Sequence, residues 1–440
     1  MNLEKNIKGK INACHLLKGF KDILPEEAVY FDKIVTVGER IAKHYGFKKI
    51  LTPVLEETRL YRRTTGDGSD IVQKEMFSFT DLGGDQVSLR PEFTPGFARA
   101  YSEHGMINLP QPVKLYSVGP LFRYEKPQTG RFRQFWQLNL ETLGEKNSIV
   151  DAQLIILANQ IFKELDIGID IFINSIGCHT CRKQYLPILT RYLRSKKNIL
   201  CENCLERIKV NPLRVLDCKE EQCQEFLDQA PQIIDHLCEE CQQHFTQVVE
   251  YLDTTEIAYE LNPRLVRGLD YYTRTTFEIF PKAEERGRQS ALAGGGRYDD
   301  LLENISGRAA PAAGFAIGIE RVMAKLKEKQ PDLKTNKIEV FVAQLGVEAR
   351  KRCLKIYENL IQDGFNVAES FSKEGLGNQL EAANKAGASF TIILGQKELL
   401  EKTIIIRDME SGVQEIVDLE KISLELKKRL EKQKIISQQS

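Results

Sequence analysis

The stretch FRYEKPQTGRFRQFWQLNLETLG, from Phe122 to Gly144, decides the fold of this chain. Two strand-like runs flank a polar loop, and the second run alternates with the period of two that is typical of a β-strand. Its two faces are Gln134, Trp136, Leu138 and Leu140 on one side, and Arg133, Phe135, Gln137, Asn139 and Glu141 on the other. The pattern predicts an antiparallel hairpin with one packed face and one polar face.

The polar face of this hairpin predicts ligand binding, because Arg123 stands beside it on the first strand. A planar guanidinium next to amide and carboxylate groups suits a ligand that carries a carboxylate or phosphate together with a cationic group. The alternative, for an isolated strand, is a half-exposed strand that faces water. The neighbouring arginine favours recognition of a small molecule.

Upstream of the hairpin, the apolar positions from Glu26 to Phe47 recur every three or four residues and predict an amphipathic helix that ends at Gly46. The stretch FKKILTPVLEET follows, with Pro53 inside it. Because proline cannot donate to a ladder, we expect an edge strand there. A long helix followed by an edge strand is a suitable place for a dimer contact.

With 440 residues the chain is too long for one core, so two or three domains are expected. A cysteine-rich segment interrupts the sheet pattern, which resumes at LVRGLDYYTRTTFEIF. After a polar linker, strands alternate with helices, which is typical of a small α/β domain. The predicted parts are a sheet domain in two pieces, residues 1–170 and 256–328, an insertion at 171–255, an α/β domain at 329–425, and a charged tail at 426–440.

Composition places few limits on the partners of the chain. Lys+Arg and Asp+Glu both number 62, so the net charge gives no evidence for nucleic-acid binding. The loop EKPQTGRFR nevertheless mixes Lys126, Arg131 and Arg133 with Phe132, a composition that can contact phosphates and stack on an unpaired base. A solvated turn is the alternative. No apolar run has the length of a membrane span, and we expect a cytoplasmic protein.

Eight of the ten cysteines lie between Cys178 and Cys241, and this concentration predicts a metal site because disulfides are rare in the cytosol. They form two patterns, C-x2-C-x19-C-x2-C from Cys178, Cys181, Cys201 and Cys204, and C-x4-C-x14-C-x2-C from Cys218, Cys223, Cys238 and Cys241. Eight thiolates match two closed structural zinc sites. The four pairs can combine in three ways, and the sequence does not choose among them.

Other interpretations of the cysteines are free or redox-active thiols and an iron–sulfur cluster. Three nearby histidines, His179, His236 and His244, are candidates to replace a ligand. Our hypothesis is that zinc replaces a hydrophobic core in an insertion too small to build one.

Nearly the whole chain resembles the class II aminoacyl-tRNA synthetases, and among them the histidyl-tRNA synthetases. GFKKILTPVLEE is similar to the dimer-interface motif, FRYEKPQTGRFRQFWQ to the second motif and GFAIGIERV to the third. LVRGLDYYTRT and AGGGRYD match elements peculiar to the histidine enzyme and its close relatives. The resemblance implies an α+β catalytic domain with an antiparallel sheet, a cysteine-rich insertion that reaches toward the tRNA acceptor stem, and a C-terminal α/β anticodon-binding domain.

The resemblance also implies an activity. Members of the family activate L-histidine with ATP and Mg2+ to histidyl-adenylate and pyrophosphate, and then transfer histidine to the 3′ end of tRNA(His), acting as homodimers. Arg123 matches the arginine that holds the α-phosphate, Arg321 the one that holds the γ-phosphate, and Arg267 an arginine on the opposite side of the α-phosphate, near the substrate carboxylate. For each of them, the alternative is a surface or helix-capping arginine.

The same resemblance assigns a histidine pocket. Its matched residues are Glu92, Phe93, Thr94, Gln137, Glu141, Tyr271 and Tyr272, beside Arg123 and Arg267. An imidazole and an α-ammonium need acceptors at both ends, which carboxylates and a phenol supply.

Three positions of this pocket raise further expectations. In a strand, DYY places its tyrosines on opposite faces, so we expect Tyr272 in the pocket and leave Tyr271 open between pocket and packing. Tyr298, in the GRYD turn, is a further candidate. Phe93 stands where many relatives carry glycine, which affects how closely the backbone approaches a ligand.

Two other functions remain as alternatives. One is the histidine-sensing, non-catalytic regulatory subunit of ATP phosphoribosyltransferase, which resembles the synthetases but generally lacks the anticodon-binding domain and an intact LVRGLDYY-type arginine element. The other is a pseudo-synthetase that senses tRNA. The present chain has both features that the regulatory subunit lacks, which favours the enzyme.

Overall fold

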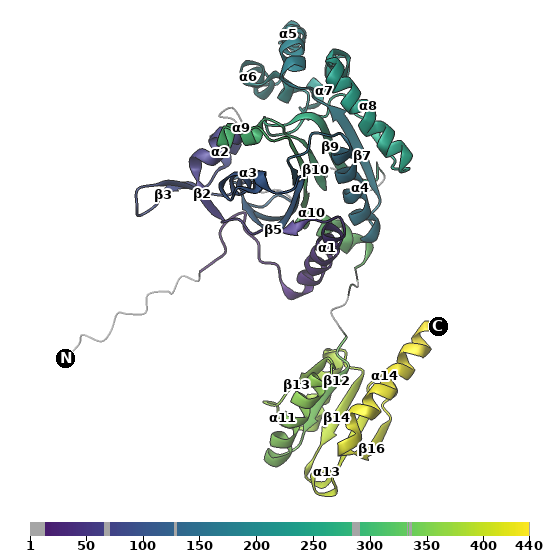
Figure 1. Cartoon of the computed structure of the whole chain (residues 1–440). Helices are drawn as coiled ribbons and strands as arrows, with labels where there is room; N and C mark the ends of the chain where they lie inside the picture. The colour runs from purple at the N-terminus through teal and green to yellow at the C-terminus, as the bar shows by residue number, and fades with distance from the viewer. Residues whose placement is uncertain are drawn as a thin grey trace, which may run out of the picture. The chain divides into compact units, whose positions relative to one another are not determined.

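The computed structural model describes residues 14–65, 71–126, 130–283, 291–331, 333 and 337–439. The chain separates into two compact units, Met1–Leu333 and Lys334–Ser440 (Figure 1). Among the described residues, no helix combines the length and the apolar character needed to cross a bilayer.

An eight-stranded sheet forms the centre of the first unit. All neighbouring strands are antiparallel except the two edge pairs, β1 with β5 and β7 with β8, which are parallel. In sheet order the strands are β1 (Lys48–Lys49), β5 (Val113–Phe122), β6 (Gln134–Leu143), β11 (Ala312–Gly318), β10 (Ala293–Arg297), β9 (Thr273–Pro281), β7 (Ile169–Ser175) and β8 (Glu260–Leu261). The predicted antiparallel hairpin is confirmed as β5 and β6.

The two faces of β6 separate as the period of two predicts. Leu138 and Leu140 pack in a hydrophobic core, whereas Asn139 and Glu141 lie buried on the other face. The helices that contribute to this core are α1 (Pro25–His44), α4 (Ile149–Glu164), α8 (Glu239–Thr254) and α10 (Ile319–Lys329). The opposite face is covered by a second core, which includes α3 (Thr94–Glu103) and α9 (Leu301–Ser306).

Helix α1 follows directly from its sequence. Proline occupies its first turn with two glutamates, where the positive end of the helix dipole favours acidic groups. Its buried stripe includes Tyr30, Ile34 and Ile41. The chain then turns at Gly46, whose φ of +81° is costly for any residue with a Cβ.

The segment after α1 is not the single edge strand predicted from its sequence. Pro53 has no N–H to donate, and the chain divides there between two sheets. Residues before it form β1, which pairs with β5, and residues after it form β2 (Leu55–Glu57) in a small sheet with β4 (Gln86–Leu89) and β3 (Ser78–Thr80). Helix α2 (Thr58–Thr65), a π-helical turn (Ile71–Glu75) and a 3-10 turn (Met106–Asn108) complete this region.

The cysteine-rich insertion begins after Ser175, because β7 belongs to the central sheet and spans the predicted boundary at residue 171. It comprises α5 (His179–Ser195), α6 (Glu202–Val210), α7 (Glu221–Leu227) and two 3-10 turns, Pro212–Val215 and Ile233–His236, before α8 returns to the main core. Figure 1 shows α5, α6 and α7 gathered at one end of the first unit.

The hypothesis that zinc replaces a hydrophobic core in this insertion is wrong. Leu189, Leu193, Val215 and Leu227 are fully or almost fully buried there, in the same apolar cluster as Phe97 of α3. The insertion therefore has an apolar core that continues into the sheet domain.

The second unit is a five-stranded mixed sheet with helices, as the alternating pattern predicts. Its strands in sheet order are β13 (Val367–Glu369), β12 (Val340–Gln344), β14 (Phe390–Leu394), β15 (Thr403–Asp408) and β16 (Gln414–Asp418). Its helices are α11 (Val347–Gln362), α12 (Leu376–Lys385), α13 (Gln396–Glu401), α14 (Ile422–Gln439) and the 3-10 turn Leu419–Lys421. The predicted start of a charged tail at residue 426 falls inside α14, where Leu426 and Leu430 are buried in the core of this unit.

Candidate active site

A cavity in the first unit brings together residues that are far apart in the sequence. Arg123, Gln137, Arg267 and Arg321 all line it. The walls come from the β5–β6 hairpin, from the segment before β9, from β10 and from the start of α10. Three of the four are arginines, so the cavity is suited to a polyanionic ligand.

Neighbouring groups hold Arg123 and Arg321 in place. Arg123 Nε donates to the Pro91 carbonyl over 2.9 Å, and its guanidinium lies 5.3 Å from the centre of the Phe135 ring. Arg321 Nη1 donates to the Ala291 carbonyl over 2.8 Å. Burial, together with the positive charges of Arg131 and Arg123, lowers the pKa of Arg321. An anion in the cavity would relieve this repulsion.

Arg267 approaches the cavity from the segment before β9. Its Nη1 forms an ion pair with Glu278, and its guanidinium lies 5.5 Å from the centre of the Tyr272 ring. Burial by itself lowers the pKa of Arg267, but the negative charge of Glu278 outweighs this effect, so the pKa is raised. Gly294 makes room for this arginine, because a Cβ there would lie 2.5 Å from Arg267 Nη1.

A buried cluster of carboxylates and hydroxyls is built from the remaining predicted pocket residues. Tyr271 Oη donates to Glu92 Oε2 over 2.7 Å, and Thr94 Oγ1 donates to Glu141 Oε1 over 2.6 Å. Tyr298 also donates to Glu141. Burial raises the pKa of Glu141 to about 7, against the opposing effect of these donors. Glu141 is therefore poised to respond to a cationic ligand near neutral pH.

The expectation that Tyr271 and Tyr272 alternate in a strand is wrong. Both residues precede β9, and their ring centres lie 4.8 Å apart with the planes tilted by 32°. Tyr298 meets both rings edge-on, at 5.6 Å and 6.4 Å. All three tyrosines therefore belong to one buried cluster, in which Tyr271 bonds Glu92 and Tyr272 packs on Arg267.

Phe93 lies at the start of α3 and is almost fully buried. Its ring meets Phe97 edge-on at 6.0 Å and carries the Arg90 guanidinium 4.3 Å from its centre. These contacts give the Phe93 side chain a packing role in an apolar core, between the pocket residues Glu92 and Thr94 in the sequence.

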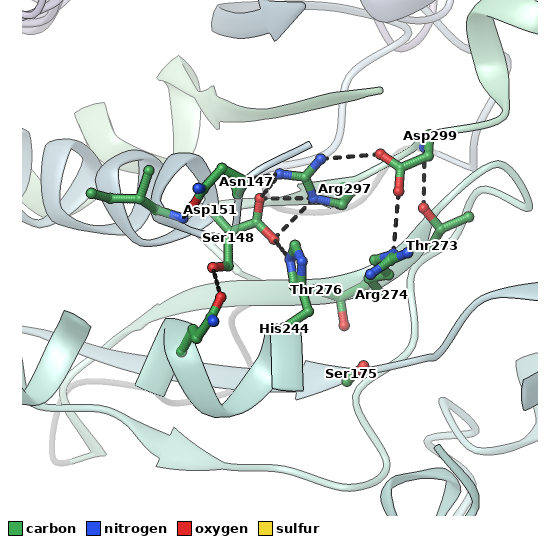
Figure 2. Close-up of polar contacts among 12 residues, drawn as sticks. Asn147, Ser148, Asp151, Ser175, His244, Thr273, Arg274, Thr276, Arg297 and Asp299 are labelled. Carbon is green, nitrogen blue, oxygen red and sulfur yellow. Dashed lines mark hydrogen bonds and ion pairs between the residues drawn. The ribbon is translucent and has the colours of Figure 1, made fainter. Parts of the chain in front are cut away.

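A buried ion network around Arg297, the residue next to Tyr298, was missed by the sequence reasoning. Arg297, which is 0% exposed, pairs with Asp151 over 2.6 Å and with Asp299 over 3.1 Å (Figure 2). His244 Nε2 lies 2.8 Å from the same Asp151 carboxylate. Burial by itself raises the pKa of Asp151, but Arg297 and His244 outweigh this effect, so the pKa is lowered. The network fixes the turn that carries Tyr298; the sequence signal for it was the arginine in GRYD, whose partners are remote in the chain.

The eight clustered cysteines divide into two groups of four. Within each group the sulfurs lie within 4.8 Å of one another. The first cluster is Cys178, Cys181, Cys238 and Cys241, and the second cluster is Cys201, Cys204, Cys218 and Cys223. The outermost pairs of the insertion thus combine with each other, and the inner pairs combine with each other. Both groups contain only cysteines, and His244 bonds Asp151 instead of replacing a ligand.

The predicted nucleic-acid loop is described on both sides of residues 127–129, which lie outside the described residues. Arg131 pairs with Glu125 over 3.3 Å, and the Arg133 guanidinium lies 3.5 Å from the centre of the Tyr124 ring. The Phe132 ring has Lys21 Nζ 5.8 Å from its centre. Arg131 and Phe132 also line the cavity, so one basic and one aromatic residue of this loop lie at the arginine site.

Comparison with known proteins gives the same family at the level of sequence and of structure. A family model described as histidyl-tRNA synthetase matches residues 19–322, and one described as an anticodon binding domain matches residues 339–429. Histidine–tRNA ligases of Natranaerobius thermophilus and Desulfosudis oleivorans are 40% and 42% identical, over 93% and 92% of this chain and 98% and 95% of their own lengths.

Among solved structures, the apo histidyl-tRNA synthetase of S. aureus is similar to this chain with a TM-score of 0.79 and 32% identity, covering 94% of this chain and 100% of that one. A Bacillus halodurans protein described as an ATP phosphoribosyltransferase regulatory subunit/histidyl-tRNA synthetase shares the fold with a TM-score of 0.64 at 19% identity. With its sheet, its arginine-lined cavity and its matched length, the chain belongs to the histidyl-tRNA synthetase family.

Proposed function

We propose that the chain is a histidine–tRNA ligase, which activates L-histidine with ATP to histidyl-adenylate and pyrophosphate and transfers histidine to the 3′ end of tRNA(His). The observation that carries this proposal is the convergence of Arg123, Arg267 and Arg321 on one cavity. Family membership supplies the reaction, and the cavity supplies groups of the right charge for it.

In the activation step the histidine carboxylate attacks the α-phosphate of ATP in line, and negative charge builds on the phosphoryl oxygens. Catalysis of such a step is mainly positioning and electrostatic stabilisation. We assign Arg123 and Arg267 to opposite sides of the α-phosphate, and Arg321 to the γ-phosphate. When bound with ATP, Mg2+ would neutralise phosphate charge, and Glu320, which lines the cavity, offers it a carboxylate.

We assign histidine recognition to the buried carboxylate–tyrosine cluster, which does not line the cavity itself but meets it where Tyr272 contacts Arg267. The α-ammonium and imidazole N–H groups of histidine need acceptors, which Glu92, Glu141 and Gln137 supply. Thr94 and Tyr298 orient Glu141, and Tyr271 orients Glu92. Tyr272 lies against the Arg267 guanidinium, and this contact links the proposed histidine pocket to the proposed phosphate site.

Recognition of tRNA is assigned to two regions. The loop around Arg131 and Phe132 would meet the acceptor end, since it stands at the cavity, and the second unit would bind the anticodon. A cytoplasmic location agrees with this partner.

A homodimer is supported by exposed apolar residues beside the predicted interface motif. Leu51, two residues before Pro53, is 75% exposed, and Val54 and Leu55 are also exposed. Replacing Leu51 with aspartate should produce a monomer by light scattering, and an unchanged mass would contradict this interface.

The two cysteine clusters fit structural Zn2+. Four thiolates at a Zn–S distance of about 2.3 Å define a tetrahedron with S–S edges of about 3.8 Å. The Cys178 sulfur lies 3.6 Å from that of Cys181 and 3.8 Å from that of Cys238, and the Cys201 sulfur lies 3.8 Å from that of Cys218. Backbone N–H groups of Cys238 and Cys201 point at the sulfurs of Cys181 and Cys223. We therefore assign two zinc ions per chain.

The direct test of the transfer reaction is aminoacylation with labelled histidine and purified tRNA transcripts. We expect acylation of tRNA(His) and of no other tRNA. A histidine-sensing regulatory subunit would bind histidine without charging any tRNA, and a tRNA-sensing pseudo-synthetase would bind tRNA without forming adenylate. Metal analysis of protein purified without chelator should give two zinc ions per chain, and a metal-free protein would overturn the zinc assignment.

A further inference from the structure

The segment from Arg267 to Arg274 carries three of the proposed site residues and is bonded at four positions by the cysteine-rich insertion and its flanks. The hydrogen bonds from the insertion and its flanks reach every second residue of this segment: Gly268, Asp270, Tyr272 and Arg274. This regular attachment indicates that the inserted domain affects the position of the active-site segment.

The second cysteine cluster is joined to the first half of the segment. Between Cys204 in α6 and Cys218 after the following 3-10 turn stand Asn211 and Arg214. Asn211 Nδ2 donates to Asp270 Oδ1 over 2.7 Å, and Arg214 Nη1 donates to the Gly268 carbonyl. Asn211 Oδ1 also accepts from the N–H of Leu213, so the same side chain caps the turn.

The first cysteine cluster is joined to the second half of the segment. Arg182, next to Cys181, donates from Nη2 to the Tyr272 carbonyl and from Nε to the Ile176 carbonyl. Glu240, next to Cys241, accepts from Arg274 Nη2 over 2.6 Å. Each of these two residues is the sequence neighbour of a cysteine of the first cluster. Arg182 bonds Tyr272, and Glu240 bonds Arg274.

Arg274 itself needs such support. Its φ of +50° lies in the left-handed region, which is unfavourable for a residue with a Cβ. Its N–H donates to the Gly177 carbonyl over 3.0 Å, and its carbonyl accepts from the N–H of Ile176 over 2.8 Å. Both partners directly precede Cys178, so the same chain that enters the first cluster holds the strained residue.

We propose that the insertion is a metal-dependent brace for the active site: Zn2+ in the two cysteine clusters fixes the Gly268–Arg274 segment and so positions Arg267, Tyr271 and Tyr272 for histidine activation. This inference rests on the proposed ligase function and adds a role in the first step of the reaction. Arg182 and Asn211 are positioning residues, since they act through the segment and not on substrate.

The brace predicts an effect of metal on a step that needs no tRNA. Metal-depleted protein and protein reconstituted with Zn2+ are compared in histidine-dependent ATP–pyrophosphate exchange and by hydrogen–deuterium exchange of peptides covering residues 267–274. We expect depletion to raise the KM for histidine about tenfold, to increase deuterium uptake in these peptides, and to be reversed by Zn2+. An unchanged histidine KM with unchanged uptake, and with only tRNA charging reduced, would show that the insertion serves tRNA alone.

A substitution that keeps the metal sites separates bracing from folding. Asn211→Asp keeps the oxygen that caps the turn but replaces the donor to Asp270 with a second oxygen, which the Asp270 carboxylate repels. We therefore expect a higher KM for histidine, with two zinc ions still bound. Arg191→Gln, on the exposed side of α5, is the matched control and should change neither. An Asn211→Asp variant with the parental KM and parental uptake would overturn the brace. Absence of any exchange with histidine in the parent protein would instead overturn the proposed function, while deuterium uptake would still report on the brace.

Discussion

The Tyr271 hydroxyl donates a 2.7 Å hydrogen bond to the Glu92 carboxylate, joining two residues 179 positions apart in the sequence. Both groups are buried, and burial together with the charge of Glu92 raises the pKa of the Tyr271 hydroxyl. The bond fixes the orientation of a carboxylate that we assign to histidine recognition.

Removing this hydroxyl should weaken histidine binding without unfolding the protein. A hydrogen bond to a charged group is worth about 1.5–3 kcal/mol, so Tyr271→Phe should lower kcat/KM for histidine in pyrophosphate exchange by about tenfold or more. Tyr259→Phe is a matched control, because it removes a 2.9 Å hydroxyl–carboxylate bond to Asp253 at the surface. Equal effects of the two substitutions would contradict the assigned role.

Arg267 should matter for adenylate formation more than for stability. Loss of one donor to a developing oxyanion commonly costs about 100-fold or more in rate, and we expect this from both Arg267→Ala and Arg267→Lys. The lysine variant keeps a positive charge beside Glu278, so it separates geometry from charge. Arg264→Ala, which removes a pair with Asp228 away from the cavity lining, is the control. Pre-steady-state adenylate formation is the measurement, and retained activity in both Arg267 variants would remove this residue from the mechanism.

Histidine affinity should depend on the ionisation of Glu141. Because burial raises the pKa of this carboxyl to about 7, only about a tenth of it is ionised at pH 6 and about nine-tenths at pH 8. The carboxylate form attracts a cationic ligand, so affinity should rise with pH through this range by up to about ninefold. Free histidine titrates as well, and the Glu141→Gln variant isolates the contribution of the enzyme. Calorimetric titrations from pH 6 to 8 should give a flatter profile for Glu141→Gln; parallel profiles would count against Glu141.

The Arg297–Asp151 pair should govern the stability of the first unit. Arg297→Met leaves the Asp151 carboxylate buried without its main partner, and breaking a buried pair typically costs about 3–5 kcal/mol. Denaturant unfolding of the parent and variant measures this loss. Lys385→Met, which removes an exposed pair with Glu381 in the second unit, should leave the stability unchanged. A loss as small for Arg297→Met as for the control would show that the network is not structural.

Local patterns in the sequence predicted the parts of the fold that local physics determines. The alternation of Leu138 and Leu140 with Asn139 and Glu141 reports which face of β6 is buried, because a strand exposes successive side chains to opposite sides. The buried stripe of α1 follows in the same way from helical spacing. Both predictions need only neighbours along the chain.

The remaining features depend on how distant segments meet. The two tyrosines of DYY favour a strand, yet the segment lies outside β9, where the insertion bonds Asp270 and the Tyr272 carbonyl, and the two rings stay together. The pairing of the cysteines depends on the path of α5 to α8 and could not follow from spacing alone. Arg297 finds its partner 146 residues earlier, which no local pattern reveals.

The measurement that tests the ligase assignment most directly is ATP–pyrophosphate exchange by the purified protein, with each amino acid supplied separately. The arginine cavity and the carboxylate–tyrosine cluster predict exchange with histidine and with no other amino acid. Absence of exchange with every amino acid, or exchange driven by a different one, would contradict the account.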